Sequence, residues 1–562
     1  MTNSARGRLL LLIPPETPLD SFAVCRAQPN LLPEQLPESQ RQLFGSFDWR
    51  PREQLGIGCL AAMLRQSGYE VRVVDCAAEM LGMFEAVEVI SLYAPDWIGI
   101  SISSPLQASG AEIIGQLVSK RRPHTHICVG GAAAVANYKE LLRKLSFVSS
   151  AVVGEGEATV LELVRSLERG EDWRRVRGLA SLEGEGVAYS PRLRHCDLGS
   201  IPFPERDTLK HFRRRGVNIP VVNMFSSRYC LAGCVECNGS LADVPGRAKH
   251  LRYRSAEDMT AELEMLFEQV NARRFYYVDE DFLGPESCDR VLEFAERVLS
   301  RGLNVELLIE CPAEQVSREK IHALKRAGLR RVLLSLATAN EEGPEWQEIN
   351  GMALAICRES RLAVEPSMIL FGETTTPEEL REAGEFMRKH ALHECRQPLF
   401  LLNRLQFFPG TRIEDALRYD IAANESEITT SRAPARCQDP VVDLIWRKLR
   451  LACVRLYGQS EVQFPFVAAN IWQKARRSPP RQGDVSTREL FSKTRLWRAH
   501  IGDLFLDWIQ VCLTVVDDRD HQLEALEYEL TQAIQAATDG YDLRWLGVSF
   551  DQVARTAQAP CH

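Results

Sequence analysis

The feature that most limits how this chain of 562 residues can fold is a regular alternation of short apolar runs with segments of helical spacing. In the first two hundred residues, candidate buried strands lie at 9–13, 71–74, 97–103, 126–129 and 151–153. Apolar strands that are each followed by a helix are typical of a parallel sheet covered by helices on both faces. We therefore predict a doubly wound, Rossmann-like α/β domain over residues 1–200.

A second alternating block follows the proline-containing stretch LGSIPFPERD at 198–207, which we interpret as a linker. Candidate strands recur at 221–225, 275–278, 305–309, 331–336, 366–371 and 399–407. Six strands at this spacing predict a partial (β/α)6 barrel over residues 201–425, with its chemistry at the carboxyl ends of the strands. Beyond it, apolar residues at three- and four-residue spacing predict a mostly helical domain over 426–562.

The composition argues against several partners. A net charge of −8 is unfavourable for a general nucleic-acid binder, and we expect no nucleic-acid partner. No run approaches the roughly 20 uninterrupted apolar residues of a membrane span, and LLLLIPP is better explained as a buried strand than as a signal peptide. Sixteen cysteines without a secretion signal favour reduced thiols. We therefore expect a cytoplasmic protein with no membrane partner.

Three of the cysteines are clustered. Cys230, Cys234 and Cys237 form a CxxxCxxC pattern directly after the first strand of the second block. Three thiolates at this spacing can hold a 4Fe–4S cluster and leave its fourth iron without a protein ligand. A zinc site with an unmapped fourth ligand, or coincidence, are the alternatives.

On these residues the chain resembles the radical S-adenosylmethionine superfamily, over about 218–425. The resemblance implies a cluster that binds S-adenosylmethionine at its open iron and donates an electron to the sulfonium. Asp279, Glu280 and Asp281 resemble the acidic end of that family's second strand, although they could simply cap the next helix. The segments FGETTTPEEL (371–380, with Gly372) and FFPGTRIEDAL (407–417) resemble its turns after strands five and six.

Two positions depart from the family pattern. Glu236 stands where an aromatic residue is usual, and the fourth strand ends in Ser335-Leu-Ala-Thr338 instead of a Glu-Ser-Gly-like turn. An acid at 236 could contact S-adenosylmethionine or ligate the open iron. The resemblance makes Asp279, Glu280 and Glu236 the catalytic candidates, and Ser335, Thr338 and Gly372 the candidates for binding S-adenosylmethionine.

The N-terminal block resembles the cobalamin-binding domain that precedes many such enzymes. Its pattern of a serine turn ahead of a Gly-Gly pair is matched by Ser101-x-Ser103, which 26 residues separate from Gly130-Gly131. The Gly154-Glu155-Gly-Glu turn fits the same architecture, and Asp75 begins the stretch where a cobalt-ligating histidine motif would lie. We assign cobalamin binding to Ser101, Ser103, Gly130, Gly131, Gly154, Glu155 and Asp75. Because the stretch after Asp75 contains no histidine, we expect cobalamin without a histidine ligand.

The two resemblances together imply a class B, cobalamin-dependent radical S-adenosylmethionine methyltransferase. One S-adenosylmethionine would methylate cobalamin, and a second, cleaved at the cluster, would give a 5′-deoxyadenosyl radical. The methyl group would pass to an unactivated or aromatic carbon of a small-molecule or amino-acid substrate, in natural-product biosynthesis. A flavodoxin or ferredoxin would supply electrons, and the C-terminal domain would close over the barrel mouth.

Three alternatives stay open. The first is polar, non-radical methylation of tryptophan or another indole, as in the tryptophan 2-C-methyltransferase branch. The second is a cobalamin-dependent radical cyclase or rearrangement enzyme without methyl transfer. The third is a non-catalytic cobalamin or iron–sulfur sensor.

Overall fold

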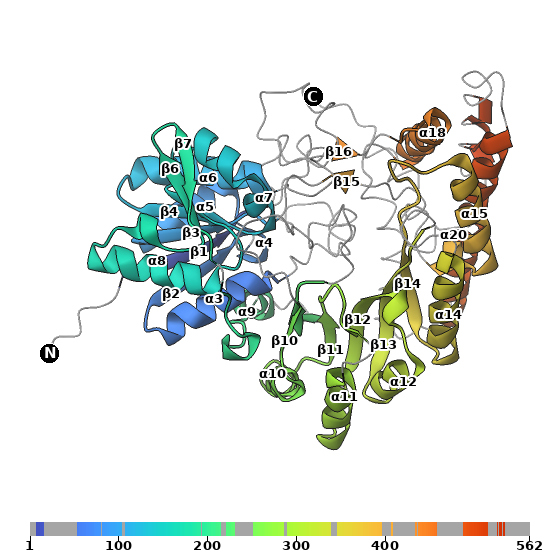
Figure 1. Ribbon diagram of the computed structural model, residues 1–562, viewed down its shortest axis with the longest axis horizontal. Helices are drawn as coiled ribbons and strands as arrows, with labels where there is room; N and C mark the ends of the chain where they lie inside the picture. The colour runs from blue at the N-terminus through green and yellow to red at the C-terminus, as the bar shows by residue number, and fades with distance from the viewer. Residues whose placement is uncertain are drawn as a thin grey trace, which may run out of the picture.

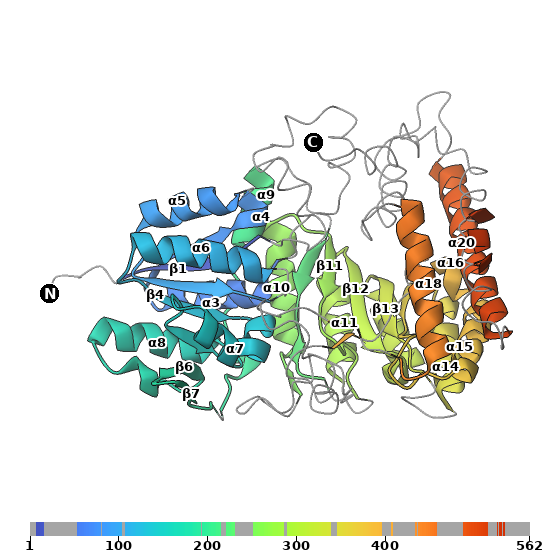
Figure 2. The same cartoon turned by 90° about the horizontal axis from the view of Figure 1, so that it is seen from above.

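The chain forms an N-terminal α/β unit, a central partial barrel and a set of C-terminal helices at the far edge of the barrel (Figures 1 and 2). This arrangement confirms the predicted fold class. The computed structural model describes residues 7–15, 53–79, 81–103, 107–192, 194–214, 221–230, 251–285, 289–338, 345–395, 406–407, 433–434, 437–457, 487–514, 525–526, 528–530 and 532–533.

The N-terminal unit is built on a seven-stranded sheet with the order β2-β1-β3-β4-β5-β6-β7. The first five strands are parallel, and the last two form an antiparallel hairpin at one edge. The chain order reverses between β1 and β3, which is the point where doubly wound sheets bind ligands at their carboxyl edge. The strands are β1 (Arg8–Ile13), β2 (Glu70–Asp75), β3 (Trp97–Ser101), β4 (His126–Gly130), β5 (Ser150–Val152), β6 (Leu179–Glu183) and β7 (Gly186–Tyr189).

Helices cover both faces of this sheet, which explains why its central strands are apolar throughout. Leu10 and Leu12 of β1 face one core, and Leu9 and Leu11 face the other. The first core is closed by α5 (Met83–Tyr93), α6 (Ala108–Arg121) and α7 (Ala132–Lys144), and the second by α3 (Leu55–Gln66) and α8 (Glu157–Arg169). The short helices α4 (Cys76–Glu79), η3 (Trp173–Arg175) and η4 (Leu198–Ser200) complete the unit.

The linker packs tightly onto α3 before it enters helix α9 (Asp207–Arg214). A Cβ at Gly58 would lie 2.7 Å from the carbonyl oxygen of Glu205 and 2.9 Å from Cβ of Pro204, so only glycine allows this approach. The amide of Glu205 also donates to the carbonyl of Gly58 at 3.1 Å. The glycine therefore serves the packing of the linker.

A buried chain of charges joins the N-terminal unit to the barrel. Arg206 of the linker is only 5% exposed, and its guanidinium lies 3.0 Å from Oε2 of Glu53 and 2.6 Å from Oε1 of Glu262. Glu262, which is fully buried, also pairs with Arg254. Burial raises the pKa of Glu53, although Arg206 works against this shift. At this depth, removing one member of the chain would leave the others as uncompensated buried charges, which strongly destabilises a protein.

The central unit is a five-stranded parallel sheet with the order β14-β13-β12-β11-β8. Alternate residues of its strands are buried beneath the outer helices, as in β12, where every second side chain is buried. The strands are β8 (Val222–Met224), β11 (Arg274–Tyr277), β12 (Glu306–Pro312), β13 (Leu329–Ser335) and β14 (Ala363–Ser367). The helices are α10 (Ala256–Gln269), α11 (Arg290–Ser300), η5 (Ala313–Gln315), α12 (Arg318–Arg326), α14 (Trp346–Glu359), α15 (Pro377–Lys389) and α16 (Leu392–Cys395).

Five of the six predicted barrel strands thus lie in the parallel sheet. The sixth was predicted at 399–407, of which 399–405 lie outside the described residues. The end of that run, β15 (Gln406–Phe407), pairs antiparallel with β16 (Ala433–Pro434) and belongs to a separate two-stranded ladder.

The C-terminal helices that the structure describes flank the barrel, and the closure of this domain over the barrel mouth stays a prediction. Helices α18 (Pro440–Tyr457) and α20 (Thr487–Thr514) pack beside α15 and α16, next to the edge strand β14 (Figure 1). Arg388 of α15 binds Asp503 at 3.1 Å and Asp507 at 2.5 Å on α20. Among the residues that the structure describes, no helix combines the length and the apolarity that crossing a bilayer requires.

The buried charge chain generates a stability prediction. Replacing Arg206 by alanine leaves Glu53 and Glu262 buried without their cation and should lower the free energy of unfolding by about 3–5 kcal/mol. The matched control is Lys210→Ala, which removes an exposed pair with Glu205 and should cost less than about 1 kcal/mol. Urea unfolding followed by circular dichroism measures both. Equal losses in the two variants would contradict the assigned role of Arg206.

Candidate active site

Four predicted cofactor-binding residues lie together at the carboxyl edge of the N-terminal sheet. Ser101 ends β3 and donates its hydroxyl to Oε1 of Gln54 at 2.7 Å. Ser103 donates both its amide and its hydroxyl to Oε1 of Gln107 at 3.0 Å. Gly130 ends the neighbouring strand and accepts a hydrogen bond from the amide of Ile102 at 2.7 Å. The serine turn and the Gly-Gly pair therefore form one surface at the switch point of the sheet.

Two glycines at this edge have backbone conformations that side chains rarely adopt. Gly131 has φ of +101°, and a Cβ there would lie 2.8 Å from the backbone of Ile102. Gly154 has φ of +98°, but a Cβ there would meet no atom within 4 Å. Gly131 is therefore required by packing inside the edge, whereas Gly154 leaves open space above the backbone. Such uncovered backbone suits the close approach of a large ligand.

Asp75 forms hydrogen bonds inside the protein that connect two of its elements. Its carboxylate is 1% exposed, accepts a hydrogen bond from the amide of Ala78 at 3.0 Å and another from the hydroxyl of Thr208 at 2.7 Å. Burial raises its pKa, and these two donors oppose the shift. Both oxygens are engaged inside the protein, so Asp75 ties β2 to the linker helix α9 and presents no oxygen to a cofactor.

The cysteine motif starts on a small hairpin made of β9 (Ser227–Arg228) and β10 (Arg252–Tyr253). Cys230 is half-buried and lies two residues beyond β9, whereas Cys234, Glu236 and Cys237 lie outside the described residues. Tyr229, between the strand and the cysteine, has φ of 77°, which costs a non-glycine residue about 1–2 kcal/mol. Surrounding contacts must hold this turn in place.

Asp279 supplies part of that support. Its carboxylate, at the end of β11, accepts hydrogen bonds from the amide of Ser226 at 2.8 Å and from the hydroxyl of Ser227 at 2.5 Å. Burial raises the pKa of Asp279, while these donors favour its ionised form. We predicted a catalytic role for Asp279; with its oxygens occupied by the start of the hairpin, it is a positioning residue in this structure.

The three acids after β11 therefore differ in environment. Asp281 is 3% exposed and accepts a hydrogen bond from the amide of Gly284 at 2.9 Å. Lys320 of α12 is also buried and donates to the carbonyl of Pro285 at 2.8 Å, which fixes the same loop. Glu280, between the two buried acids, is exposed. Of the three acids at this strand end, Glu280 is therefore the one that solvent reaches.

The Gly154-Glu155-Gly-Glu157 turn reaches across to the cysteine hairpin. Oε2 of Glu155 lies 3.1 Å from Nη1 of Arg228, and its other oxygen pairs with Arg252. Oε1 of Glu157 lies 2.5 Å from Nη2 of Arg228. Burial would raise the pKa of Glu157, but pairing with Arg228 outweighs it and lowers the pKa. Glu155, predicted to bind a cofactor, here anchors the hairpin that leads to Cys230.

The inner face of the central sheet is polar, which our sequence reasoning missed. The Tyr276 hydroxyl donates to Oε2 of Glu310 at 2.9 Å, and Arg331 pairs with Glu365. All four are partly exposed and come from adjacent strands. The available signal was a polar residue at several alternate strand positions, such as Glu306 and Glu310 of β12. This face can receive a polar substrate.

The remaining predicted residues lie at strand ends of the same sheet. Ser335 closes β13, paired with Pro312 on one side and Ser367 on the other. Thr338 follows in a turn that the fully buried Asn350 holds through the amide of Ala337. The amide of Gly372 donates to the hydroxyl of Thr375 at 2.8 Å. These turns are fixed by internal hydrogen bonds at the carboxyl edge, where barrel enzymes bind their ligands.

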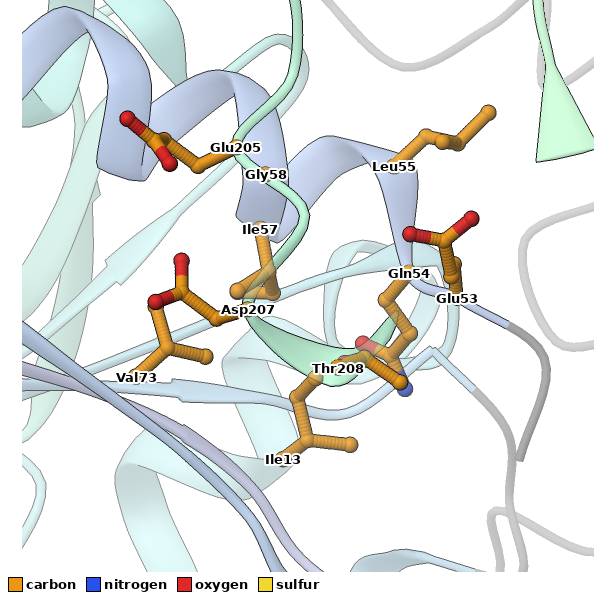
Figure 3. A pocket seen from close by; sticks show the side chains of 10 residues that line it. All are labelled: Ile13, Glu53, Gln54, Leu55, Ile57, Gly58, Val73, Glu205, Asp207 and Thr208. Carbon is orange, nitrogen blue, oxygen red and sulfur yellow. The ribbon is translucent and has the colours of Figure 1, made fainter. Parts of the chain in front are cut away.

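A small hollow marks the junction of the N-terminal unit with the linker (Figure 3). Its wall combines side chains of β1, β2 and the start of α3 with those of the linker, and Gln54 and Thr208 point into the same region (Figure 3). The lining residues are Ile13, Glu53, Gln54, Leu55, Ile57, Gly58, Val73, Glu205, Asp207 and Thr208.

Comparison with known proteins agrees with this geometry. Residues 52–164 match the family model of the B12 binding domain. An uncharacterized methyltransferase of Pyrococcus horikoshii is 24% identical over 424 residues, which are 73% of this chain and 88% of that protein. The hopanoid C-3 methylase of Methylococcus capsulatus is 26% identical over 296 residues, 52% of this chain and 54% of the relative. An anaerobic magnesium-protoporphyrin IX monomethyl ester cyclase of Synechocystis is 26% identical over 304 residues, 52% of this chain and 58% of the relative.

Two solved structures share the architecture. OxsB, a cobalamin-dependent S-adenosylmethionine radical enzyme solved with aqua-cobalamin and S-adenosylmethionine, superposes with a TM-score of 0.73 over 98% of this chain and 83% of its own, at 14% identity. The chain therefore shares the overall fold of this enzyme. The radical S-adenosylmethionine methyltransferase TsrM of Kitasatospora setae, solved with its tryptophan substrate and an S-adenosylmethionine analogue, aza-SAM, superposes with a TM-score of 0.57 over 94% of this chain and 99% of its own, at 15% identity.

The positioning role of Asp279 can be tested with a matched pair of variants. Asp279→Asn cannot accept all the hydrogen bonds of the Ser226-Ser227 turn and should lower the free energy of unfolding by about 1–3 kcal/mol. Iron and sulfide retained after anaerobic reconstitution should fall at least about two-fold. Glu280→Gln, one residue away and exposed, should retain wild-type iron and stability. Wild-type cluster content in Asp279→Asn would show that the turn does not need this carboxylate.

Proposed function

We propose that this chain is a cobalamin-dependent radical S-adenosylmethionine enzyme that transfers a methyl group to a carbon atom of a small-molecule or amino-acid substrate. The observation that carries the proposal is the contact of Glu155 with Arg228 and Arg252. It joins the carboxyl edge of a B12-binding domain to the hairpin that begins the cysteine motif. A protein built to use only one of the two cofactors has no need of this junction.

The residues present fit both cofactors. Cys230, Cys234 and Cys237 would hold the 4Fe–4S cluster, with three thiolates at a spacing such clusters use. The open backbone at Gly154 and the serine and glycine edge at 101–103 and 130–131 would receive cobalamin. When bound, a corrinoid supplies a methyl carrier and the cluster supplies single electrons to S-adenosylmethionine, chemistry that side chains cannot perform.

The side chains of the barrel would position the reactants. Glu280 is exposed beside the hairpin and can accept hydrogen bonds from a ligand amino or hydroxyl group. The turns at Ser335, Thr338 and Gly372 would hold S-adenosylmethionine at the carboxyl edge. Glu236, next to the last cysteine, would contact the same ligand. The polar inner face around Glu310 would orient the substrate.

Partners follow from this chemistry. A radical reaction at a 4Fe–4S cluster consumes electrons one at a time, so we propose that a flavodoxin or ferredoxin supplies them to this protein. The names of the relatives, a methyltransferase and a methylase among them, support methyl transfer. The substrate would be a small natural product or an amino acid that fits the barrel.

Two other reactions are kept as candidates, each for a stated reason. The likeness to TsrM with tryptophan, together with an acid at Glu236, favours a polar methylation of an indole ring as the first. The likeness to the protoporphyrin ester cyclases favours ring formation without methyl transfer as the second.

The test uses the full chain, reconstituted anaerobically with iron, sulfide and hydroxocobalamin, then reduced and given S-adenosylmethionine with a deuterated methyl group. The proposal predicts the deuterated methyl group on cobalamin extracted in the dark, with an equal amount of S-adenosylhomocysteine. It also predicts slow formation of 5′-deoxyadenosine. Cys230→Ala should lose the 5′-deoxyadenosine.

The other outcomes are distinct. Labelled cobalamin without any 5′-deoxyadenosine would favour the polar route. Formation of 5′-deoxyadenosine without labelled cobalamin would favour the cyclase. The absence of both products would indicate a sensor and overturn the proposal.

A further inference from the structure

The hairpin that leads into the cysteine motif contains an unfavourable pair of charges. In the register of β9 and β10, Arg228 lies directly opposite Arg252. Like charges at directly opposite positions of an antiparallel pair destabilise it. The ladder is also only two residues long on each strand, and the strained turn at Tyr229 follows it at once. The hairpin cannot be stable through its own contacts alone.

Part of the missing stabilisation comes from the N-terminal unit, beside the support that Asp279 gives from within the barrel. Glu155 contacts both arginines, and Glu157 adds a second carboxylate on Arg228 at 2.5 Å. The side chains are largely withdrawn from water, at 20% exposure for Glu155, 12% for Arg252 and 5% for Glu157. Arg252 also donates to the carbonyl of Cys196 at 2.8 Å. At this burial the contacts are screened far less than surface pairs.

Glu155 occupies a distinctive position among these groups. It is the carboxylate that reaches both strands of the hairpin, and it stands between Gly154 and Gly156 on the turn that follows β5. Glycine on both sides gives this turn more conformational freedom than a helix or strand. A Cβ at Gly154 would also meet no atom within 4 Å, so the space above this backbone is open. A ligand resting there would restrict the turn and with it the direction of the Glu155 side chain.

The junction is not needed merely to hold the two units together. Arg206 already joins them through Glu53 and Glu262, with deeper burial. The contacts of Glu155 are therefore available for a second purpose, which is to close the hairpin.

We propose that Glu155 is a positioning residue that couples the two cofactor sites. Occupation of the carboxyl edge at Gly154 fixes the Gly154–Glu157 turn, Glu155 then closes the Arg228–Arg252 hairpin, and the closed hairpin retains the cluster. The inference rests on the proposed function, because it takes the ligands to be cobalamin and a 4Fe–4S cluster. Coupling between two binding equilibria is reciprocal, so the cluster must strengthen cobalamin binding by the same factor.

The experiment measures the Kd of hydroxocobalamin for the full chain, by spectroscopic titration, before and after removal of the cluster with an iron chelator. The inference predicts that the cluster-free protein binds about 5-fold or more weakly, within the usual range of coupled sites. In Glu155→Gln the ratio of the Kd without the cluster to the Kd with the cluster should fall towards one. The matched control is Glu162→Gln, which removes a carboxylate that pairs with Arg192 on the outer face of α8 and should keep the wild-type ratio.

A second variant separates positioning from folding. Arg252→Gln removes one of the two opposed cations, so the hairpin no longer depends on Glu155. In the double variant with Glu155→Gln, iron retention should therefore return towards the wild-type level, which a loss of general stability would not produce.

The results that overturn the inference differ from those that overturn the proposed function. If the wild type binds cobalamin with the same Kd with and without the cluster, the coupling alone is refuted. The same holds if Glu155→Gln keeps the wild-type ratio of the two Kd values. A double variant that retains no more iron than Glu155→Gln also refutes it. A chain that binds neither cobalamin nor iron refutes the coupling and the proposed function together.

Discussion

Two arginines face each other at the base of the cysteine loop, and the negative charge that keeps them together belongs to a different domain. Glu155 and Glu157 leave the end of one parallel sheet and neutralise Arg228 and Arg252 at the start of the other. These contacts join the carboxyl end of β5 to the hairpin that follows β8. Because Cys230 follows Arg228 by two residues, the same contacts also determine where the cluster motif begins.

The junction lies at the carboxyl ends of the strands in both parallel sheets. Parallel sheets gather ligands at the carboxyl ends of their strands, in doubly wound folds as in barrels. Glu155 follows the carboxyl end of β5, and Arg228 follows that of β8, so the two ligand-binding edges meet. Asp279 supports the hairpin from within the barrel, and Arg206 also joins the two units, through Glu53 and Glu262. Each carboxyl edge is thus formed by its own sheet, and ion pairs connect the two edges.

Much of this fold could be predicted from local patterns. Continuous apolar runs such as 9–13 identify strands buried on both faces, and Gly131 identifies a turn that no side chain permits. The roles of single acids could not be predicted, because their partners lie far away in the sequence. Asp75 and Asp279 resemble site residues by position, yet they accept hydrogen bonds from Thr208 and Ser226. The polar inner face was missed because these strands were identified by their apolar residues, and the polar residues between them were given no role.

The central claim is that the carboxyl edges of the two sheets adjoin, so that cobalamin and the cluster lie close enough to interact. Electron paramagnetic resonance of the reconstituted full chain tests this directly, by comparing the relaxation of cob(II)alamin with the cluster oxidised, hence diamagnetic, and reduced, hence paramagnetic. The account predicts faster relaxation of the cobalt signal when the cluster is reduced. Identical relaxation in both states, with both cofactors bound, would contradict it.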